Sequence, residues 1–202
     1  MSAPTAVTAE LLRGLPLPRA SDESDKDGRG RVLVIAGSPE VPGAALLAGV
    51  AALRAGAGKL QIATVASIAP HLGLDVPEAL VVALPESPEG GISPMTAKLL
   101  VPRLERCDAV LIGPGMLDEE AVRDLAAIVL DGADGPTFVL DAGALTRLAE
   151  ITDALRCQPG TMVITPHTGE MATLLGIPRR AVMAIFSAAP VRLLVACKPW
   201  SR

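Results

Sequence analysis

Short apolar runs that alternate with helix-forming segments are the feature of this sequence that most restricts its fold. The run 31–36 (RVLVIA) is continuous, rich in β-branched residues and bounded by glycines, which predicts a buried strand. The next segment, 43–55, is rich in alanine and leucine and predicts a helix. Strands that alternate with helices form right-handed units and a mainly parallel sheet. We therefore predict an α/β protein with helices on both faces of the sheet.

The same reading places the remaining elements. Further strands are predicted at 60–64, within 77–84, and at 109–112, 137–140 and 162–164. Further helices are predicted at 6–13, 94–106, 118–130, 144–150 and 169–175. Ligands of such sheets bind beyond the carboxyl ends of the strands, so the loops that follow strands are the candidate functional regions. The loops with unusual composition are 37–44, 113–115, 141–144 and 165–170.

Composition excludes several classes of function. The net charge is −4, which offers no basic surface for nucleic acid or a membrane. One Trp, two Phe and no Tyr leave no base-stacking surface for single strands. Three cysteines lie far apart without a CxxC pair, so we expect no zinc site, no disulfide framework and a cytoplasmic location. The first residues lack the pattern of a signal peptide, and no uncharged run is long enough to span a bilayer.

Two of the loops leave their role open. Loop 37–44 joins a strand to an alanine-rich helix, so it is either an anion-binding helix start or a tight connection that needs glycine. Asp141 follows the strand 137–140, where a carboxylate can orient a hydroxyl group or hold a metal ion through water. It can equally cap the short helix that follows it.

The loop 165–170 (TPHTGE) is the sharpest local feature. His167 is one of two histidines in the chain and stands at a strand end, where it can donate a hydrogen bond to a phosphate or a ribose. Glu170 is expected in the first turn of the next helix. The other histidine, His71, lies in an apolar segment and is expected to have a surface or structural role.

Taken together in their order, several segments resemble the ADP- or ATP-dependent NAD(P)H-hydrate dehydratases. They are KDGRGRVLVIAGS (26–38), PGAALLAGVAALRAGAGKL (42–60), the Pro77-Glu78 pair, IGPG (112–115), LDAGAL (140–145) and TPHTGEMATLLG (165–176). The resemblance implies a ribokinase-like three-layer sandwich. It also implies the repair of NAD(P)H hydrate: ADP or ATP, with Mg²⁺, phosphorylates the hydroxyl group of the hydrated ring, and phosphate then leaves.

The resemblance also suggests roles for individual residues. It implies that Ala44, Gly115 and His167 contact the hydrated dinucleotide and that Gly43 and Gly113 allow close approach of the backbone. Possible polar contacts come from Asp141 and Glu170.

The family pattern continues with a Leu-Lys-Gly strand and a glycine-rich motif that carries the catalytic Asp. This sequence has no glycine after Gly176, so no catalytic residue is assigned, and we expect a chain that lacks the C-terminal part of the fold and has little activity. An exposed sheet edge then favours a homo-oligomer. The alternatives are a non-catalytic dinucleotide-binding remnant or subunit, and a small-alcohol kinase. The expected organisation is an N-terminal helix and polar loop at 1–27, an α/β domain at 28–182 and an atypical tail at 183–202.

Overall fold

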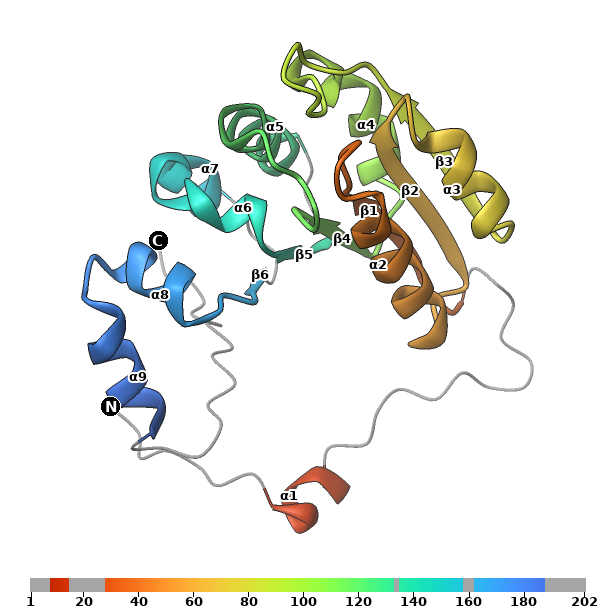
Figure 1. Ribbon diagram of the computed structural model, residues 1–202. Helices are drawn as coiled ribbons and strands as arrows, with labels where there is room; N and C mark the ends of the chain where they lie inside the picture. Colours follow the sequence, from red (N-terminus) through yellow and green to blue (C-terminus); the bar gives the residue numbers. More distant parts are fainter. Residues whose placement is uncertain (1–7, 15–27, 133–134, 158–161, 188–202) are drawn as a thin grey trace.

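The computed structural model describes residues 8–14, 28–132, 135–157 and 162–187, and a parallel sheet forms the centre of the molecule (Figure 1). Six strands lie in the order β3-β2-β1-β4-β5-β6, and all neighbouring strands are parallel. The predicted α/β class with a parallel sheet is confirmed. The strands are β1 (Arg31–Ile35), β2 (Lys59–Val65), β3 (Ala79–Leu84), β4 (Ala109–Ile112), β5 (Thr137–Leu140) and β6 (Met162–Ile164).

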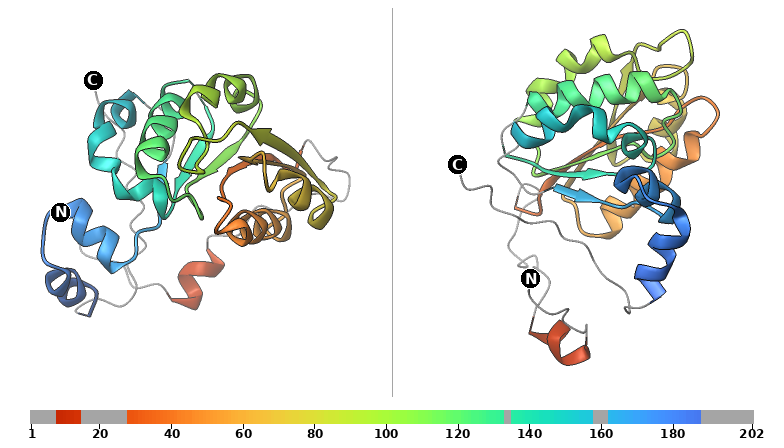
Figure 2. Two further views of the ribbon diagram at one scale, coloured as in Figure 1. Left: turned by 45° about the horizontal axis from the view of Figure 1, so that its top comes forward. Right: turned by 90° about the vertical axis from the view of Figure 1, so that its left-hand side faces the viewer.

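Helices cover both faces of this sheet. Figure 2 shows α2 and α3 on one face and α4 and α5 on the other, which makes three layers. Within the described ranges, no helix has the length and apolar character needed to cross a membrane. The helices are α1 (Ala9–Arg13), α2 (Pro42–Arg54), α3 (Ala69–Asp75), α4 (Ala97–Leu104), α5 (Glu119–Asp131), α6 (Gly143–Thr146), α7 (Thr152–Cys157), α8 (Thr168–Leu175) and α9 (Arg179–Ser187).

Several helix predictions need correction. The predicted helix 144–150 is two short elements, α6 and the 3-10 helix Leu148–Ile151, and the predicted helix 94–106 begins with a 3-10 turn at Pro94–Thr96. Helix α1 begins at Ala9, where Thr8 accepts a hydrogen bond from the Leu11 amide as N-cap. The predicted residues 6 and 7 of that helix lie outside the described ranges. Sequence reasoning also missed α3, α7 and α9.

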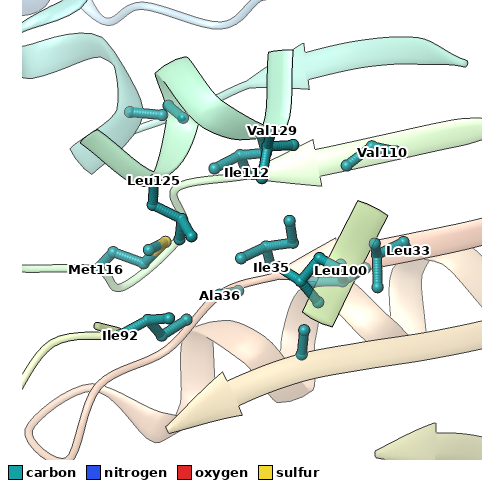
Figure 3. Packing of buried hydrophobic residues seen from close by; sticks show 14 of the residues in the cluster. Leu33, Ile35, Ala36, Ile92, Leu100, Val110, Ile112, Met116, Leu125 and Val129 are labelled. Atoms are coloured by element: carbon teal, nitrogen blue, oxygen red, sulfur yellow. The ribbon is translucent and has the colours of Figure 1, made fainter. Parts of the chain in front are cut away.

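Apolar residues of the helices on both faces of the sheet pack against the strands. Helix α5 buries residues of a single face, among them Leu125 and Val129, against Ile112 of β4 and Met116 (Figure 3). Asp118 caps this helix, since its side chain accepts a hydrogen bond from the Ala121 amide. The acidic first turn and the cap match the prediction of a helix start at this place.

The direction in which successive strands are added to the sheet reverses between β1 and β4, which are parallel neighbours. From β1 the strands proceed to β2 and β3 on one side, and from β4 to β5 and β6 on the other. The loops after β1 and β4 meet there, because the Gly37 amide donates a 2.8 Å hydrogen bond to the Pro114 carbonyl. In open α/β sheets the crevice at such a reversal point is the usual ligand site.

A buried hydroxyl group in β2 costs stability. Thr64 is 0% exposed, and its Oγ1 has no hydrogen-bond partner among the described residues. Replacing it with valine, which has nearly the same shape, removes an unpaired polar atom. We expect Thr64→Val to raise the free energy of unfolding by about 1 kcal/mol in denaturant titration.

Thr96 provides the matched control for this change. It is 5% exposed, and its Oγ1 donates a 2.6 Å hydrogen bond to the Ser93 carbonyl. Thr96→Val is therefore expected to lower the free energy of unfolding by about 1 kcal/mol. If both substitutions destabilised the protein equally, Thr64 would have a partner that its surroundings do not reveal.

Candidate functional site

Ala44 and Gly115 lie in contact at the carboxyl edge of the sheet. Gly115 has a φ of +69°, and a Cβ atom built there would lie 2.6 Å from the Ala44 Cβ and 2.8 Å from the Val41 carbonyl oxygen. Only glycine lets the loop after β4 approach the start of α2 so closely. Two residues that the sequence analysis placed in one site are thus neighbours in space.

Gly113 joins the loop after β4 to the loop after β5. Its φ is +117°, and a Cβ atom would overlap the Asp141 carbonyl oxygen and lie 2.8 Å from the Ala144 Cβ. Gly113 is buried, so the packing of the two loops accounts for the glycine at this position. Its contact with a ligand stays a prediction.

Gly43 differs from the other two glycines. It lies exposed in the first turn of α2, and outside the helix's own backbone no atom of the described residues stands within 4 Å of the position that a Cβ would take. No packing contact in the described part of the chain requires glycine there. The open space beside its backbone is what a close approach by a ligand needs.

Asp141 is held by a residue that sequence reasoning did not single out. Its Oδ1 accepts a 2.7 Å hydrogen bond from the Thr165 hydroxyl group, which joins the loops after β5 and β6. The alternative that Asp141 caps the following helix is wrong, since the N-cap of α6 is Ala142 and has no side-chain cap. In the sequence, Thr165 directly follows the predicted strand 162–164 and Asp141 directly follows the predicted strand 137–140. This pattern could have indicated the contact between the two side chains.

The backbone after Asp141 has an unusual conformation. Ala142 has φ 45° and ψ −115°, a region that residues with a Cβ rarely adopt. The next residue, Gly143, packs so closely on Met116 that a Cβ would overlap the carbonyl oxygen of that residue. The loops after β4 and β5 therefore interlock, and such strain is typical of sites that must hold a fixed shape.

His167 and Glu170 form the N-terminal cap of α8. The His167 Nδ1 accepts hydrogen bonds from the amides of Gly169, at 2.9 Å, and Glu170, at 3.2 Å. In return Glu170 Oε2 accepts a 2.8 Å hydrogen bond from the His167 amide. The opposite ring nitrogen, Nε2, lies 3.3 Å from Glu170 Oε1, and the histidine side chain is 72% exposed.

Contacts thus connect most of the predicted site residues along one edge of the sheet. Ala44 touches Gly115, and Gly113 packs against the loop of Asp141. Asp141 is bonded to Thr165, two residues before His167. His71, the other histidine, lies exposed on α3. The site residues other than His71 lie along one edge of the sheet, at the carboxyl ends of β1, β4, β5 and β6.

A cavity of about 290 Å³ borders the same loops. Residues 38–40, 88–91 and 117–118 line it, at the reversal point between β1 and β4. Its ionisable lining residues are Glu40, Glu89 and Asp118, all of them acidic. Their negative charge disfavours the binding of phosphate groups in this cavity but does not disfavour the uncharged part of a nucleotide.

Cys107 does not provide a reactive thiol. Cys107 is 8% exposed, and burial, with a smaller contribution from Asp108, raises the pKa of its thiol. A thiol with a raised pKa is a poor nucleophile at neutral pH. Within the described ranges, no group of three or more His, Cys, Asp or Glu side chains is placed to hold a metal ion.

Comparisons with known proteins agree with this arrangement. A family model described as NAD(P)H-hydrate dehydratase matches residues 32–189. The chain is 49% identical over 179 residues to the ADP-dependent (S)-NAD(P)H-hydrate dehydratase of Xanthomonas campestris pv. campestris, which covers 88% of this chain and 58% of that protein. The enzyme of the same name from Bacillus subtilis is 38% identical, over 80% of this chain and 53% of its own length. The chain therefore spans a little more than half of these relatives.

Solved structures show the same fold. The Bacillus subtilis ADP/ATP-dependent NAD(P)H-hydrate dehydratase, co-crystallised with ATP and Mg²⁺, superposes with a TM-score of 0.68 at 34% identity, over 88% of this chain and 58% of that one. A ribokinase-like superfamily protein from Enterococcus faecalis gives a TM-score of 0.65 at 24% identity, over 84% of this chain and 58% of its own. The predicted ribokinase-like sandwich is thus confirmed, and the chain belongs to the NAD(P)H-hydrate dehydratase family.

Proposed function

We propose that this chain binds NAD(P)H hydrate for an ADP- or ATP-dependent dehydration that restores NAD(P)H. The observation that carries the proposal is the row of contacts that links Ala44, Gly115, Gly113 and Asp141 to the loop of His167 at one sheet edge. In the reaction, the nucleotide transfers its terminal phosphoryl group to the hydroxyl group of the hydrated ring. Loss of phosphate and a ring proton then restores the double bond.

The described residues serve the binding part of this reaction. Ala44, Gly115 and His167 are proposed to contact the dinucleotide. The open space beside Gly43 lets the dinucleotide approach the backbone of α2. We assign no catalytic base. An Mg²⁺ ion that accompanied ADP or ATP would be held chiefly by phosphate oxygens and water, because no group of three or more His, Cys, Asp or Glu side chains is placed for a metal ion among the described residues.

Location and assembly follow as further parts of the proposal. A cytoplasmic location agrees with the free thiol of Cys107, because a reducing compartment keeps thiols unpaired. Among the described strands, β6 lies at one edge of the sheet, where a second chain can pair with it. Self-association through this edge stays a prediction, as does the division into an N-terminal part, an α/β domain at 28–182 and a tail.

Two glycine variants test the proposed site without disturbing the fold. Gly43→Ala adds a methyl group where the structure leaves open space, in the first turn of a helix. We expect it to raise the dissociation constant for NADH hydrate about ten-fold in calorimetric titration, because the methyl group blocks the approach of the ligand. Gly73→Ala on α3, whose Cβ would make one ordinary contact with Val81, is the control and should bind normally.

The assay for turnover uses the same samples. Hydrated NADH is mixed with ADP and Mg²⁺, and the recovery of reduced-nicotinamide absorbance is followed. Binding with recovery supports the dehydratase, whereas binding without recovery supports the alternative of a dinucleotide-binding subunit. A chain that binds no NADH hydrate overturns the proposed function.

A further inference from the structure

Three backbone amides at the start of α8 donate hydrogen bonds to side chains of the same turn. The amides of Gly169 and Glu170 donate to His167 Nδ1, and the His167 amide donates to Glu170 Oε2. A helix start normally offers such amides to an anion. These three donors are therefore not available to a ligand, whereas the exposed edge of the imidazole ring is.

The cap also decides which ring nitrogen carries the proton. An atom that accepts two N–H hydrogen bonds must present its lone pair, so Nδ1 carries no proton while the cap is intact. The proton of the neutral ring then sits on Nε2. Nε2 lies 3.3 Å from Glu170 Oε1, a contact that is not one of the hydrogen bonds of the cap, so Nε2–H stays available to a ligand.

Glu170 contacts both sides of this arrangement. One of its oxygens accepts from the His167 amide, and the other faces Nε2–H. Its side chain is 19% exposed, so it is far less free to move than the 72% exposed histidine. The carboxylate therefore restrains the orientation of the ring, whereas the two amides that donate to Nδ1 set the position of its proton.

Resting on the proposed function, we propose that Glu170 is a positioning residue that makes His167 a hydrogen-bond donor to an uncharged oxygen of the dinucleotide, a hydroxyl or carbonyl group, rather than to phosphate. The donor is Nε2–H, since Nδ1 is occupied by the cap. A phosphate oxygen at Nε2 would lie beside the Glu170 carboxylate and be repelled by it. A neutral oxygen avoids this cost and keeps the benefit of the oriented donor.

The sign of one substitution separates the two kinds of acceptor. Glu170→Gln removes the negative charge and leaves a single side-chain oxygen, which cannot both accept from the His167 amide and stand beside Nε2. With a neutral acceptor, we expect the dissociation constant for NADH hydrate to rise about ten-fold, because the donor is no longer held. With a phosphate acceptor, the loss of repulsion makes binding tighter. Unchanged or tighter binding therefore overturns the proposal.

Glu119→Gln is the matched control, because Glu119 also lies in the first turn of a helix, α5, and carries the same charge. It should leave the dissociation constant for NADH hydrate unchanged. An equal loss of affinity in both variants would mean that net charge, not the position of the imidazole, controls binding, and would overturn the proposal.

Nitrogen NMR of the histidine rings gives a reading that does not depend on the ligand. In the wild-type chain, His167 should show an unprotonated Nδ1 with a scalar coupling across the hydrogen bond from the Gly169 amide. Glu170→Gln should weaken this coupling, while His71 on α3 stays unchanged. A protonated Nδ1 at neutral pH in the wild type overturns the proposal. If the NMR result holds but no NADH hydrate binds, the proposed function fails and the donor role with it.

Discussion

Replacing Gly113 with alanine is expected to lower the free energy of unfolding by about 3–5 kcal/mol, a large part of the stability of a domain of this size. The added Cβ would overlap the Asp141 carbonyl oxygen, and the φ of +117° is one that alanine rarely adopts. Both effects act on backbone in the buried centre of the site, so no rotation of a side chain can relieve them. Denaturant unfolding followed by circular dichroism measures the loss.

Gly43→Ala is the control for this experiment as well as a probe of the site. At Gly43 the same methyl group meets no atom of the described residues within 4 Å outside the helix's own backbone, and alanine is the better helix former. We expect the free energy of unfolding to stay constant or to rise by up to about 1 kcal/mol. If Gly113→Ala unfolded within 1 kcal/mol of the wild type, the interlocking of the loops after β4 and β5 would be much looser than the structure has it.

The strands were predictable because their signal is local. A run such as RVLVIA, β-branched and bounded by glycine, has few alternatives to a buried strand, and β1 occupies Arg31–Ile35 within it. Right-handed crossovers decide which face of the sheet each helix covers, but the strand order β3-β2-β1-β4-β5-β6 was not predicted from the sequence. The ends of the strands, and hence the edge that carries the site, were therefore accessible from the sequence.

The missed elements depend on tertiary packing. Helix α3 contains Pro70 and Gly73, which are poor helix formers, and it is held by burial of Ala69 and Leu72. The left-handed Ala142 has no signal in the sequence, because alanine is a typical residue of ordinary helices. It adopts this conformation where Gly113 and Gly143 let the two loops interlock.

In the loop 165–170, the positions of His167 and Glu170 could be predicted from the sequence, but their hydrogen bonds could not. A histidine at a strand end indicates a ligand contact, and Glu170 lies in the first turn of α8 as predicted. The pattern His-x-x-Glu is a capping box with histidine in place of the usual Ser or Thr. Because histidine is an unusual N-cap, the sequence did not reveal that His167 both caps the helix and faces solvent.

These two roles of His167 can be separated by a pair of substitutions. Asparagine is a strong N-cap but lacks the Nε2–H donor, so His167→Asn should keep the free energy of unfolding within about 0.5 kcal/mol of the wild type. Its binding of NADH hydrate should weaken by about 1–3 kcal/mol, the contribution of one hydrogen bond at a ligand. His167→Ala should show the same loss of binding and, in addition, lose about 1 kcal/mol of stability through the missing cap.

Calorimetric titration and denaturant unfolding of the two variants measure both quantities on the same samples. The donor role requires that the two variants lose binding equally although their stabilities differ. Wild-type affinity in His167→Asn, with weaker binding only in His167→Ala, would mean that the ligand depends on an ordered α8 and does not touch the imidazole. Because the His167 side chain is 72% exposed, its Nε2 edge is accessible to a ligand. We therefore expect both variants to lose binding equally. If His167 served only as an N-cap, its second ring nitrogen would not need to be exposed to solvent beside the Glu170 carboxylate.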